Sequence, residues 1–455
     1  MILPEALDKI RQQFDHAPYP RASLDQSPKD DANALFKHSL VTVYYRCHGR
    51  VIDPQDRLIL DAGCGSGYKC LMLAEANPGA KIVGMDLSEK SVEMTRQRLA
   101  YHGFNQVECY VGLIEDLPNL GIQFDYINCD EVLYLLPDPL AGLQAMRSVL
   151  KPDGILRVNL HSAYQRRRFY QAQELFRMLG LMDSNPEELE IGLVHETMNA
   201  LQDHVVLKTT TWRPIYQQQP EGVLADHLLV GDRGYTTPDL FKLLQAAGLE
   251  LASMVNWLHW DLRDLFQNPH ALPEPWDQIV PNCSIQEQLY FYELLNPVHR
   301  LLDAWCVLPK AEQSSTPARN PAQPNAQPNA QPSRAQEDRA LGKWQGATLH
   351  LHPQLRTERV RQALIAACQA AQPFEISRHL SQVSPTPVVL SSSQALSLLP
   401  LWDGPHSIAA IAHQYQRFHP VQLPSLEPMT ADTALGQTVE LIQRLERCLF
   451  VLVEP

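Results

Sequence analysis

Short apolar runs and segments with helical periodicity alternate through the first half of the chain. The apolar runs have the length of buried strands and lie at 58–62, 82–85, 107–111, 126–129 and 155–159. Between them, helical spacing occurs at 68–76, 88–102 and 139–150. Strands that alternate with helices form a mainly parallel sheet covered on both faces. The pattern therefore predicts an α/β fold with a doubly wound sheet.

A long insertion separates the fifth predicted strand from the next helix. That helix is predicted at 237–247, with Thr237 as its cap and Gly248 at its end, and a sixth strand follows at 249–255. Residues 161–235 lie between, with helical patterns at 166–181 and 186–201. Ligands bind at the carboxyl ends of the strands in such sheets, so we expect the insertion to form a lid over the ligand site.

The rest of the chain divides at a segment poor in apolar residues. Residues 313–339 are rich in Pro, Asn, Gln and Ala, which predicts a disordered linker. Before it, Ser284 and Glu287 have capping-box spacing and begin a helix with an apolar stripe that extends through Leu301 and Leu302, interrupted near Pro297. The stripe is interpreted as core packing, with a partner-binding face as the alternative.

Beyond the linker, helices are expected at 408–415 and 434–449, and a strand at 450–453. This order suggests a small α+β, winged-helix-like module that recognises a protein or peptide. The predicted domains are an arm at 1–45, a sheet domain at 46–265 with its lid at 161–235, a helical extension at 266–312, the linker at 313–339 and the C-terminal module at 340–455.

Composition narrows the class of ligand. The net charge of −13 disfavours nucleic acid and anionic membranes, whose binding needs basic surface. The first residues are amphipathic rather than signal-like, and no apolar run is long enough to cross a membrane, so we expect a cytoplasmic protein. Nine cysteines include no C-x-x-C pair, so neither a metal site nor a disulfide scaffold is predicted. Cys64 is interpreted as a small side chain rather than a nucleophile.

Three glycines follow the first predicted strand in the string LILDAGCGSG. Gly63, Gly65 and Gly67 make a G-x-G-x-G turn, where a backbone without Cβ can approach a ligand. A pyrophosphate-binding fingerprint requires a glycine at the position of Tyr68. No Lys-Ser or Lys-Thr pair follows at the distance of a phosphate-binding P-loop. The loop therefore favours a ligand without a pyrophosphate.

Carboxylates end the first two strands. Asp61 precedes the glycine loop, and Asp86 follows the second strand. A carboxylate at the second position can accept hydrogen bonds from both hydroxyls of a ribose. A cap for the following helix is the alternative role of Asp86.

Four segments in this order resemble class I S-adenosylmethionine (SAM)-dependent methyltransferases: LDAGCGSG, GMDLS, FDYINCDEVLYLL and LKPDGIL, within residues 58–255. The resemblance implies a Rossmann-like sheet and SAM as the cofactor. It places the methionine part at 61–67, the ribose at Asp86 with Leu87 beside it, and adenine at 112–118. Family members often carry an aspartate where Leu113 stands, so Ile114 and Glu115 are the expected substitutes.

The resemblance also locates the methyl group to be transferred. Asp130, Glu131 and Tyr134, after the fourth strand, should lie near it. His161, just past the fifth strand, is the candidate general base, with a structural histidine as the alternative. Asp130 is also expected to contact the cofactor.

The N-terminal segment 14–20, FDHAPYP, resembles an element that precedes the glycine loop in bacterial methyltransferases of the protein-lysine type, which also have a regulatory segment and a small C-terminal domain. The resemblance implies that Tyr19 closes over the cofactor; an arm packed on the domain is the alternative. The acceptor tetrapeptide N-P-P-Y or D-P-P-Y of many nucleic-acid methyltransferases is absent after the fourth strand.

We therefore expect methyl transfer to a small molecule or a protein side chain, without nucleic acid, membrane or metal. The alternative is an inactive SAM-binding scaffold that works through its C-terminal module. The oligomeric state is left open.

Overall fold

The computed structural model describes residues 5–16, 18–218, 220–310, 344, 346–422 and 424–455. The chain forms two compact units. The first comprises Met1–Ser27, Gln55–Val255 and Trp260–Ser315, and the second Pro28–Pro54, Asn256–His259 and Thr316–Pro455. Part of the predicted N-terminal arm thus belongs to the second unit. Most of the predicted linker, 313–339, lies outside the described residues.

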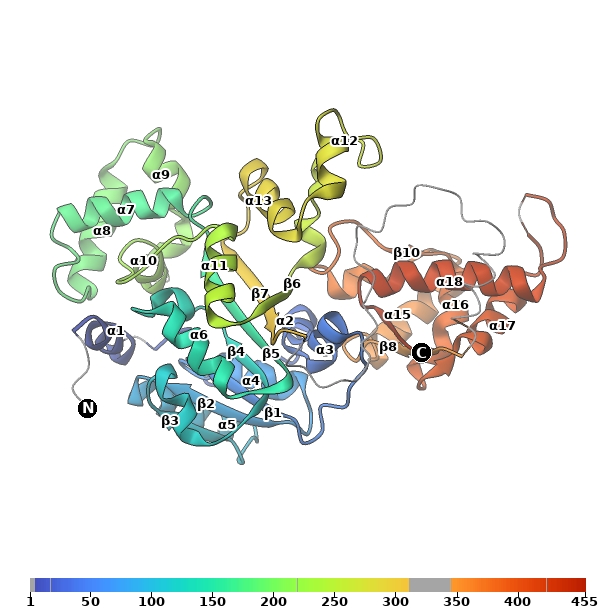
Figure 1. The fold of residues 1–455 in the computed structure, drawn as a ribbon, viewed down its shortest axis with the longest axis horizontal. Helices are drawn as coiled ribbons and strands as arrows, with labels where there is room; N and C mark the ends of the chain where they lie inside the picture. Colours follow the sequence, from blue (N-terminus) through green and yellow to red (C-terminus); the bar gives the residue numbers. More distant parts are fainter. Residues whose placement is uncertain (1–4, 17, 219, 311–343, 345, 423) are drawn as a thin grey trace. The chain divides into compact units, whose positions relative to one another are not determined.

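The first unit contains a seven-stranded sheet in the order β3-β2-β1-β4-β5-β7-β6 (Figure 1). The strands β1 to β5 are parallel, whereas β7 is antiparallel to both β5 and β6. Their bounds are β1 Leu58–Ala62, β2 Lys81–Asp86, β3 Glu108–Val111, β4 Phe124–Cys129, β5 Leu150–His161, β6 Glu250–Met254 and β7 Leu301–Val307. The predicted doubly wound, mainly parallel α/β fold is confirmed.

Helices flank this sheet as the alternating pattern predicted. The helices α4 and α5 pack together, as do α6 with α11 and α11 with α13. Their bounds are α4 Tyr68–Ala76, α5 Glu89–Tyr101, α6 Pro139–Ser148, α11 Thr237–Ala247 and α13 Ile285–Leu295. Ser88 caps α5 by accepting a hydrogen bond from the Ser91 amide at 3.0 Å.

The cap of α11 differs from the prediction by one residue. Thr236, not Thr237, accepts from the backbone of Asp239, whose carboxylate accepts in return from the Thr236 amide at 3.0 Å. The hydroxyl of Thr237 donates instead to Glu293 at 3.0 Å, so it is engaged elsewhere. Gly248 ends the helix with φ +70°, as expected.

Lys151-Pro152-Asp153-Gly154 has the residue types of a turn, and its sequence predicts a turn into the fifth strand, but these residues lie within the bounds of β5. Pairing with β4 skips from Leu150 to Ile155 while the partner advances only from Phe124 to Tyr126, so the extra residues form an irregularity in the strand. The carbonyl oxygen of Phe124 lies close to Gly154, where a Cβ would come within 2.9 Å of it. Proline and glycine in this stretch thus mark a bulge instead of a connecting turn.

The helix predicted from Ser284 ends earlier than expected, and the apolar stripe continues as β7. The helix α13 stops at Leu295, and Pro297 has no N–H with which to continue it. Leu301 and Leu302 belong to β7, which lies between two strands. Leu302 and Trp305 are completely buried. Helical spacing therefore gave the wrong element here, because pairing partners distant in sequence decide a buried strand.

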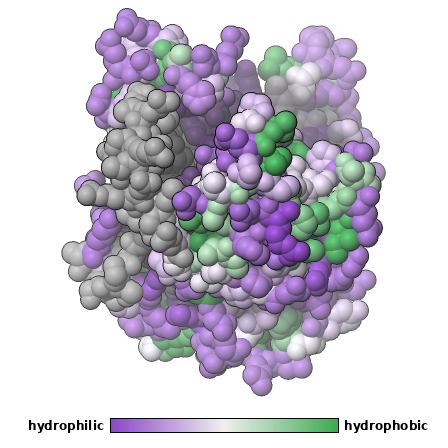
Figure 2. Space-filling view, turned by 90° about the vertical axis from the view of Figure 1, so that its right-hand side faces the viewer, coloured by the Kyte–Doolittle hydropathy of each residue, from purple (hydrophilic) through white to green (hydrophobic). Residues whose placement is uncertain are grey.

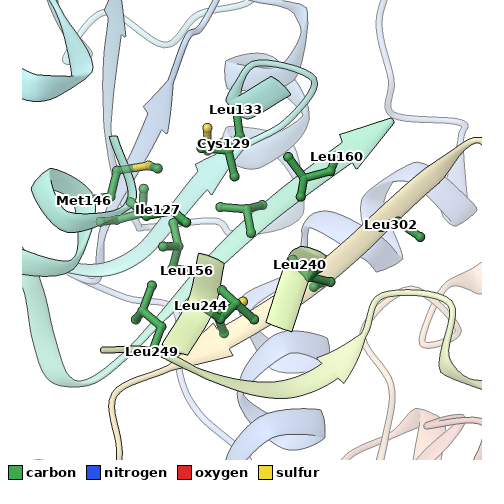
Figure 3. Packing of buried hydrophobic residues seen from close by; sticks show 14 of the residues in the cluster. Ile127, Cys129, Leu133, Met146, Leu156, Leu160, Leu240, Leu244, Leu249 and Leu302 are labelled. Atoms are coloured by element: carbon green, nitrogen blue, oxygen red, sulfur yellow. The ribbon is translucent and has the colours of Figure 1, made fainter. Parts of the chain in front are cut away.

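The main core lies between the sheet and the helices α6 and α11. Figure 3 shows Ile127 of β4 and Leu156 of β5 packed near Leu240 and Leu244 of α11, with Met146 of α6 beside them. All five side chains are buried. This core holds β4 and β5 rigidly, so the residues after these strands are fixed in position.

The insertion after β5 is a helical segment with a core of its own. Its helices are α7 Arg167–Met178, α8 Glu188–Ala200, α9 Val206–Thr211 and α10 Pro220–Asp226. Its buried apolar side chains form a separate cluster that includes Phe176, Val194 and Met198. The segment leaves and rejoins the sheet domain at one place, where Ala163 donates to the Tyr235 carbonyl and Tyr235 to that of His161, both at 2.8 Å.

The second unit combines short helices with two small sheets. The sheets have the orders β11-β8-β12 and β10-β9, with β8 Thr348–Leu351, β9 Phe374–Glu375, β10 Val389–Leu390, β11 His406–Ser407 and β12 Val451–Glu454. The helices are α2 Ala32–His38, α3 Leu40–His48, α15 Glu358–Gln369, α16 Ser392–Leu398, α17 Ile408–Phe418 and α18 Ala431–Arg447. The predicted α+β character is confirmed, and the winged-helix likeness stays a prediction.

The N-terminal helices α2 and α3 are part of this second core. Thr42 contacts the ring of the buried His352 at 2.9 Å, and the ring of Phe36 lies 4.6 Å from it. The backbone of Val453 donates to the Tyr45 hydroxyl at 2.9 Å. The face drawn in Figure 2 is mostly hydrophilic, with its apolar residues in separate groups. No helix among the described residues is long and apolar enough to cross a membrane.

His227 makes the stability of the insertion depend on pH. The imidazole is fully buried among aromatic rings that include Phe169 and Trp212, and its Nδ1 has no hydrogen-bond partner among the described residues. Burial lowers the pKa of His227 to about 4. The unfolded state therefore binds more protons between about pH 6.5 and pH 4, and stability falls as the pH falls through this window.

We expect His227→Phe to flatten this dependence, because a phenyl ring fills the same space and does not titrate. Between pH 8 and pH 5 the wild type should lose about 2 kcal/mol more than the variant. Urea unfolding followed by circular dichroism at both pH values measures the difference. Equal losses in the two proteins would contradict the argument.

Candidate active site

The glycine loop after β1 is crowded by other parts of the protein. Gly63, Gly65 and Gly67 have φ values of +85°, +53° and +82°, a region that L side chains rarely adopt. A Cβ at Gly63 would collide with the side chain of Val132, and one at Gly67 would come within 2.6 Å of the Thr95 backbone. Glycine is therefore required here by close protein contacts as well as by the turn.

The N-terminal segment lies directly against this loop. A Cβ at Gly65 would collide with the carbonyl oxygen of Tyr19. The Ser66 amide donates to the Tyr19 carbonyl at 3.0 Å, and the Ser66 hydroxyl donates to the Pro20 carbonyl at 2.6 Å. The structure thus brings Tyr19 to the loop, and its side chain remains 41% exposed.

Asp86, at the end of β2, is held by two backbone amides. Gly65 donates to one carboxylate oxygen at 2.8 Å, and Ser88 donates to the other at 2.9 Å. These bonds lower the pKa of Asp86, but burial outweighs them and raises it overall. The carboxylate therefore has a fixed orientation, which is the condition for a bidentate contact with a diol.

A cleft beside Asp86 is lined by half of the predicted cofactor contacts; Tyr19, Asp61, Gly65, Gly67 and Asp130 are not among its lining residues. Gly63, Asp86, Leu87, Ile114 and Glu115 all line it, together with residues that include Met85, Gly112, Leu113 and Val132. The parallel strands β1, β2 and β4 end side by side, and this brings their following loops to one edge.

One wall of the cleft was not predicted. It is the apolar face of α1, Glu5–His16, with Leu7, Ile10 and Phe14. Their spacing is that of one face of an amphipathic helix, and this was the available signal. Asp15 of α1 accepts a hydrogen bond from Ser88 at 2.6 Å, which ties the helix to the edge of the cleft.

Asp61 lies beneath the loop and not on the cleft wall. Its oxygens accept from the Asn128 amide at 2.8 Å and from the Cys70 thiol at 3.1 Å. Burial raises the pKa of Asp61 to about 6. A carboxylate kept at this position at a cost in desolvation is typical of a functional site.

Asp130 is enclosed in a buried ion cluster behind the cleft. Its carboxylate accepts from Lys69 at 2.5 Å and from Asn159 at 2.6 Å, and Arg157 lies 3.3 Å away. Arg157 in turn pairs with Asp303 of β7 at 2.8 Å. Asp130 is not among the residues that line the cleft. The cluster joins the ends of β4, β5 and β7.

Tyr134 and His161 are stacked, with ring centroids 3.7 Å apart. The Nδ1 atom of His161 lies 2.6 Å from Asp232, and Nε2 lies 3.1 Å from a guanidinium nitrogen of Arg300. Because a guanidinium only donates, Nε2 accepts and Nδ1 carries the proton. Burial lowers the pKa of His161, which favours the same neutral ring. The lone pair that a base would use is therefore already engaged.

Arg300 is the residue of this region that sequence reasoning missed. It directly precedes β7, and its guanidinium also donates to Glu131 at 2.5 Å. Glu131 has φ +64°, an uncommon conformation for a side chain of this kind, and its amide donates to Asn159 at 2.8 Å. Arg300 and His161 are 139 residues apart in sequence, and only the antiparallel pairing of β7 with β5 brings them together.

Comparison with known proteins agrees with this fold. The family described as a methyltransferase domain matches residues 55–219. The chain is 26% identical over 304 residues to an uncharacterised Synechococcus protein, syc1184_c, covering 65% of this chain and 70% of that protein. It is 35% identical over 103 residues to a ubiquinone biosynthesis O-methyltransferase of Actinobacillus pleuropneumoniae, covering 22% of this chain and 43% of the relative.

Among solved structures, that of PKMT2 from Rickettsia typhi resembles the chain with a TM-score of 0.56 at 14% identity, over 93% of this chain and 75% of that one. A second structure of the same protein, in complex with AdoHcy, has a TM-score of 0.55 at 15% identity, over 96% and 77%. At these identities the likeness extends to the fold alone.

The first unit is a class I SAM-dependent methyltransferase domain. Fold, family match and related sequences agree on this assignment, which confirms the resemblance seen in the sequence. Since the chain spans only 43% of the length of the O-methyltransferase relative, that protein's substrate does not carry over.

The raised pKa of Asp61 predicts a stabilising substitution. The folded state binds this proton more tightly than the unfolded state, so stability is lost as the pH rises from about 4 through about 6. Asp61→Asn keeps an acceptor for Asn128 and removes the buried charge. We expect the variant to gain up to about 3 kcal/mol over the wild type at pH 8 and less at pH 5.

Asp125→Asn is the matched control, because Asp125 is equally buried but bonded to Arg57 and Lys151, and its pKa is lowered. This variant should lose stability at pH 8. Denaturant unfolding of both variants measures whether each substitution raises or lowers the free energy of unfolding. A loss of stability in Asp61→Asn at pH 8 would refute the argument.

Proposed function

We propose that the cleft binds SAM, with the ribose at Asp86, adenine beside Ile114 and Glu115, and the methionine part toward the glycine loop above Asp61. The observation that carries this proposal is the Asp86 carboxylate, which two amides orient at the edge of the cleft. Tyr68 stands where a dinucleotide fingerprint needs a third loop glycine, and this disfavours a dinucleotide as the ligand.

When bound, SAM supplies an electrophilic methyl group on a sulfonium. An acceptor aligned by the chain would take this methyl group with a lone pair, and sulfur would keep the electron pair of the carbon–sulfur bond. The chain's part is to align the acceptor with the methyl group and to exclude water. Tyr19, Tyr134 and Glu131 are the residues we propose beside the acceptor.

The acceptor we propose is a small molecule or a protein side chain. The net charge of −13 and the absence of an acceptor tetrapeptide after β4 argue against nucleic acid. The helical insertion after β5 would shape the acceptor site as a lid. Its attachment supports this role, because Asp232 of the insertion contacts His161.

In this reaction the main role that we propose for His161 is to position Tyr134 and Arg300. Its ring stacks on Tyr134 and accepts from Arg300. The sequence predicted His161 as a general base. It can act as one only if Arg300 moves away and leaves Nε2 free to accept a proton. Acceptors that lose their proton without help need no base at all.

Isothermal titration calorimetry with SAM, followed by transfer from radiolabelled SAM into cell extract, tests the function. Binding followed by label in a protein or metabolite fraction supports an active enzyme, and the labelled fraction identifies the acceptor class. Binding without label in any fraction would favour the alternative of an inactive scaffold. No binding would refute the proposed site.

Asp86→Ala should weaken SAM binding at least tenfold, about 1.4 kcal/mol, because both ribose hydroxyls lose their acceptor. Glu93→Ala removes an exposed carboxylate from α5 and should bind SAM normally. A thermal melt of each variant checks folding, since Asp86→Ala also leaves two amides without their acceptor. Unchanged affinity in a folded Asp86→Ala protein would refute the position of the ribose.

His161→Gln separates positioning from base catalysis. The glutamine amide can accept from Arg300 and donate to Asp232, but it cannot take a proton. We expect His161→Gln to retain transfer within about tenfold, and His161→Ala to lose more. A general base contributes about 10²- to 10⁴-fold, so an equal, large loss in both variants would identify His161 as the base.

A further inference from the structure

A buried arginine joins the N-terminal segment to the glycine loop. Arg98 of α5 is 1% exposed. Its Nε donates to the Ser66 carbonyl at 2.9 Å, and its two terminal nitrogens donate to the carbonyls of Ala22 and Ser23, both at 2.7 Å. One guanidinium thus binds three carbonyls, two from the N-terminal segment and one from the loop.

The partners of Arg98 are unusual for a buried cation. Among the described residues it forms no ion pair with a carboxylate; its guanidinium lies 5.6 Å from the centre of the Tyr68 ring. Burying an arginine without an anion is costly, and the backbone carbonyls offset that cost only while the segment stays in place.

The segment that Arg98 binds is continuous in sequence with α1, which forms one wall of the cleft. Residues 19–24 form a strap, which is further bound by Ser66 at Tyr19 and Pro20 and by His102, whose Nε2 lies 3.0 Å from the Leu24 carbonyl. The strap continues backwards into α1, whose Leu7, Ile10 and Phe14 line the cleft. Strap and α1 together place one protein segment over both the loop and the cleft.

We propose that Arg98 is a positioning residue for the cofactor: it fastens the strap to the glycine loop, holds α1 over the cleft, and thereby slows release of bound SAM. The inference rests on the proposed cofactor site. Arg98 itself does not line the cleft, so its effect on SAM must pass through the strap and α1.

The test compares Arg98→Met with Arg96→Met in the full-length protein. Arg96 also lies on α5 and donates to a backbone carbonyl, that of Cys109 at 2.7 Å. Within the described part of the chain it forms no hydrogen bond with the strap. Hydrogen exchange of residues 18–24 and of α1 reports whether the strap is fastened. Stopped-flow chase of bound SAM gives the dissociation rate.

We expect Arg98→Met to raise exchange in the strap and α1 and to speed SAM dissociation at least tenfold, with Arg96→Met like the wild type. Arg98→Lys should restore part of the effect, since an ammonium can donate to some of the same carbonyls. Faster exchange with unchanged SAM dissociation would overturn the proposal, as would unchanged exchange.

Ser66→Ala covers the case in which Arg98→Met does not fold. It removes only the hydroxyl bond to the Pro20 carbonyl and should shift both readouts in the same direction by a smaller factor. If hydrogen exchange and SAM dissociation in Ser66→Ala equal those of the wild type, the proposed role of the strap in retaining SAM would be contradicted. If wild-type protein binds no SAM, the proposed function fails, whereas exchange in Arg98→Met still tests the fastening of the strap.

Discussion

The packing of the first unit around its candidate active site depends on the tight turn that follows β1. Three glycines with positive φ leave room for Val132 after β4, for Thr95 of α5 and for the carbonyl of Tyr19. Three segments from different parts of the chain can therefore meet at the end of one strand. A side chain at any of the three glycines would push one of these segments away, and the edge of the cleft would change with it. Close packing of protein segments, as much as access for a ligand, explains the glycines.

Buried ion pairs and hydrogen bonds also fix this edge of the sheet. Asp130 is buried with Lys69, Asn159 and Arg157, so its charge is satisfied and its position is fixed. A second chain of contacts runs from Glu131 through Arg300 and His161 to Asp232. It links the loop after β4, the start of β7 and the helical insertion. The insertion is therefore in direct contact with the region proposed for the acceptor.

Local patterns in the sequence predicted the elements well where each element is decided by neighbours in the chain. The bounds of β1 and α4 agree with prediction, and Ser88 and Gly248 act at helix ends as their residue types suggest. Prediction was wrong where long-range pairing decides. The β7 strand has helical spacing, and the predicted turn before Ile155 is a bulge within β5. In both places a strand from elsewhere in the chain supplied the missing information.

The sequence by itself determined the class of the protein, because the glycine loop and Asp86 are a short motif in which residue type and spacing carry the chemistry. Only the tertiary structure decided the surroundings of that motif. Arg300 reaches His161, Arg98 reaches the strap, and α1 forms a wall of the cleft through contacts between residues far apart in the chain. Such contacts depend on how strands and helices pack, and periodicity in a single sequence indicates which face of an element is buried but not what it packs against.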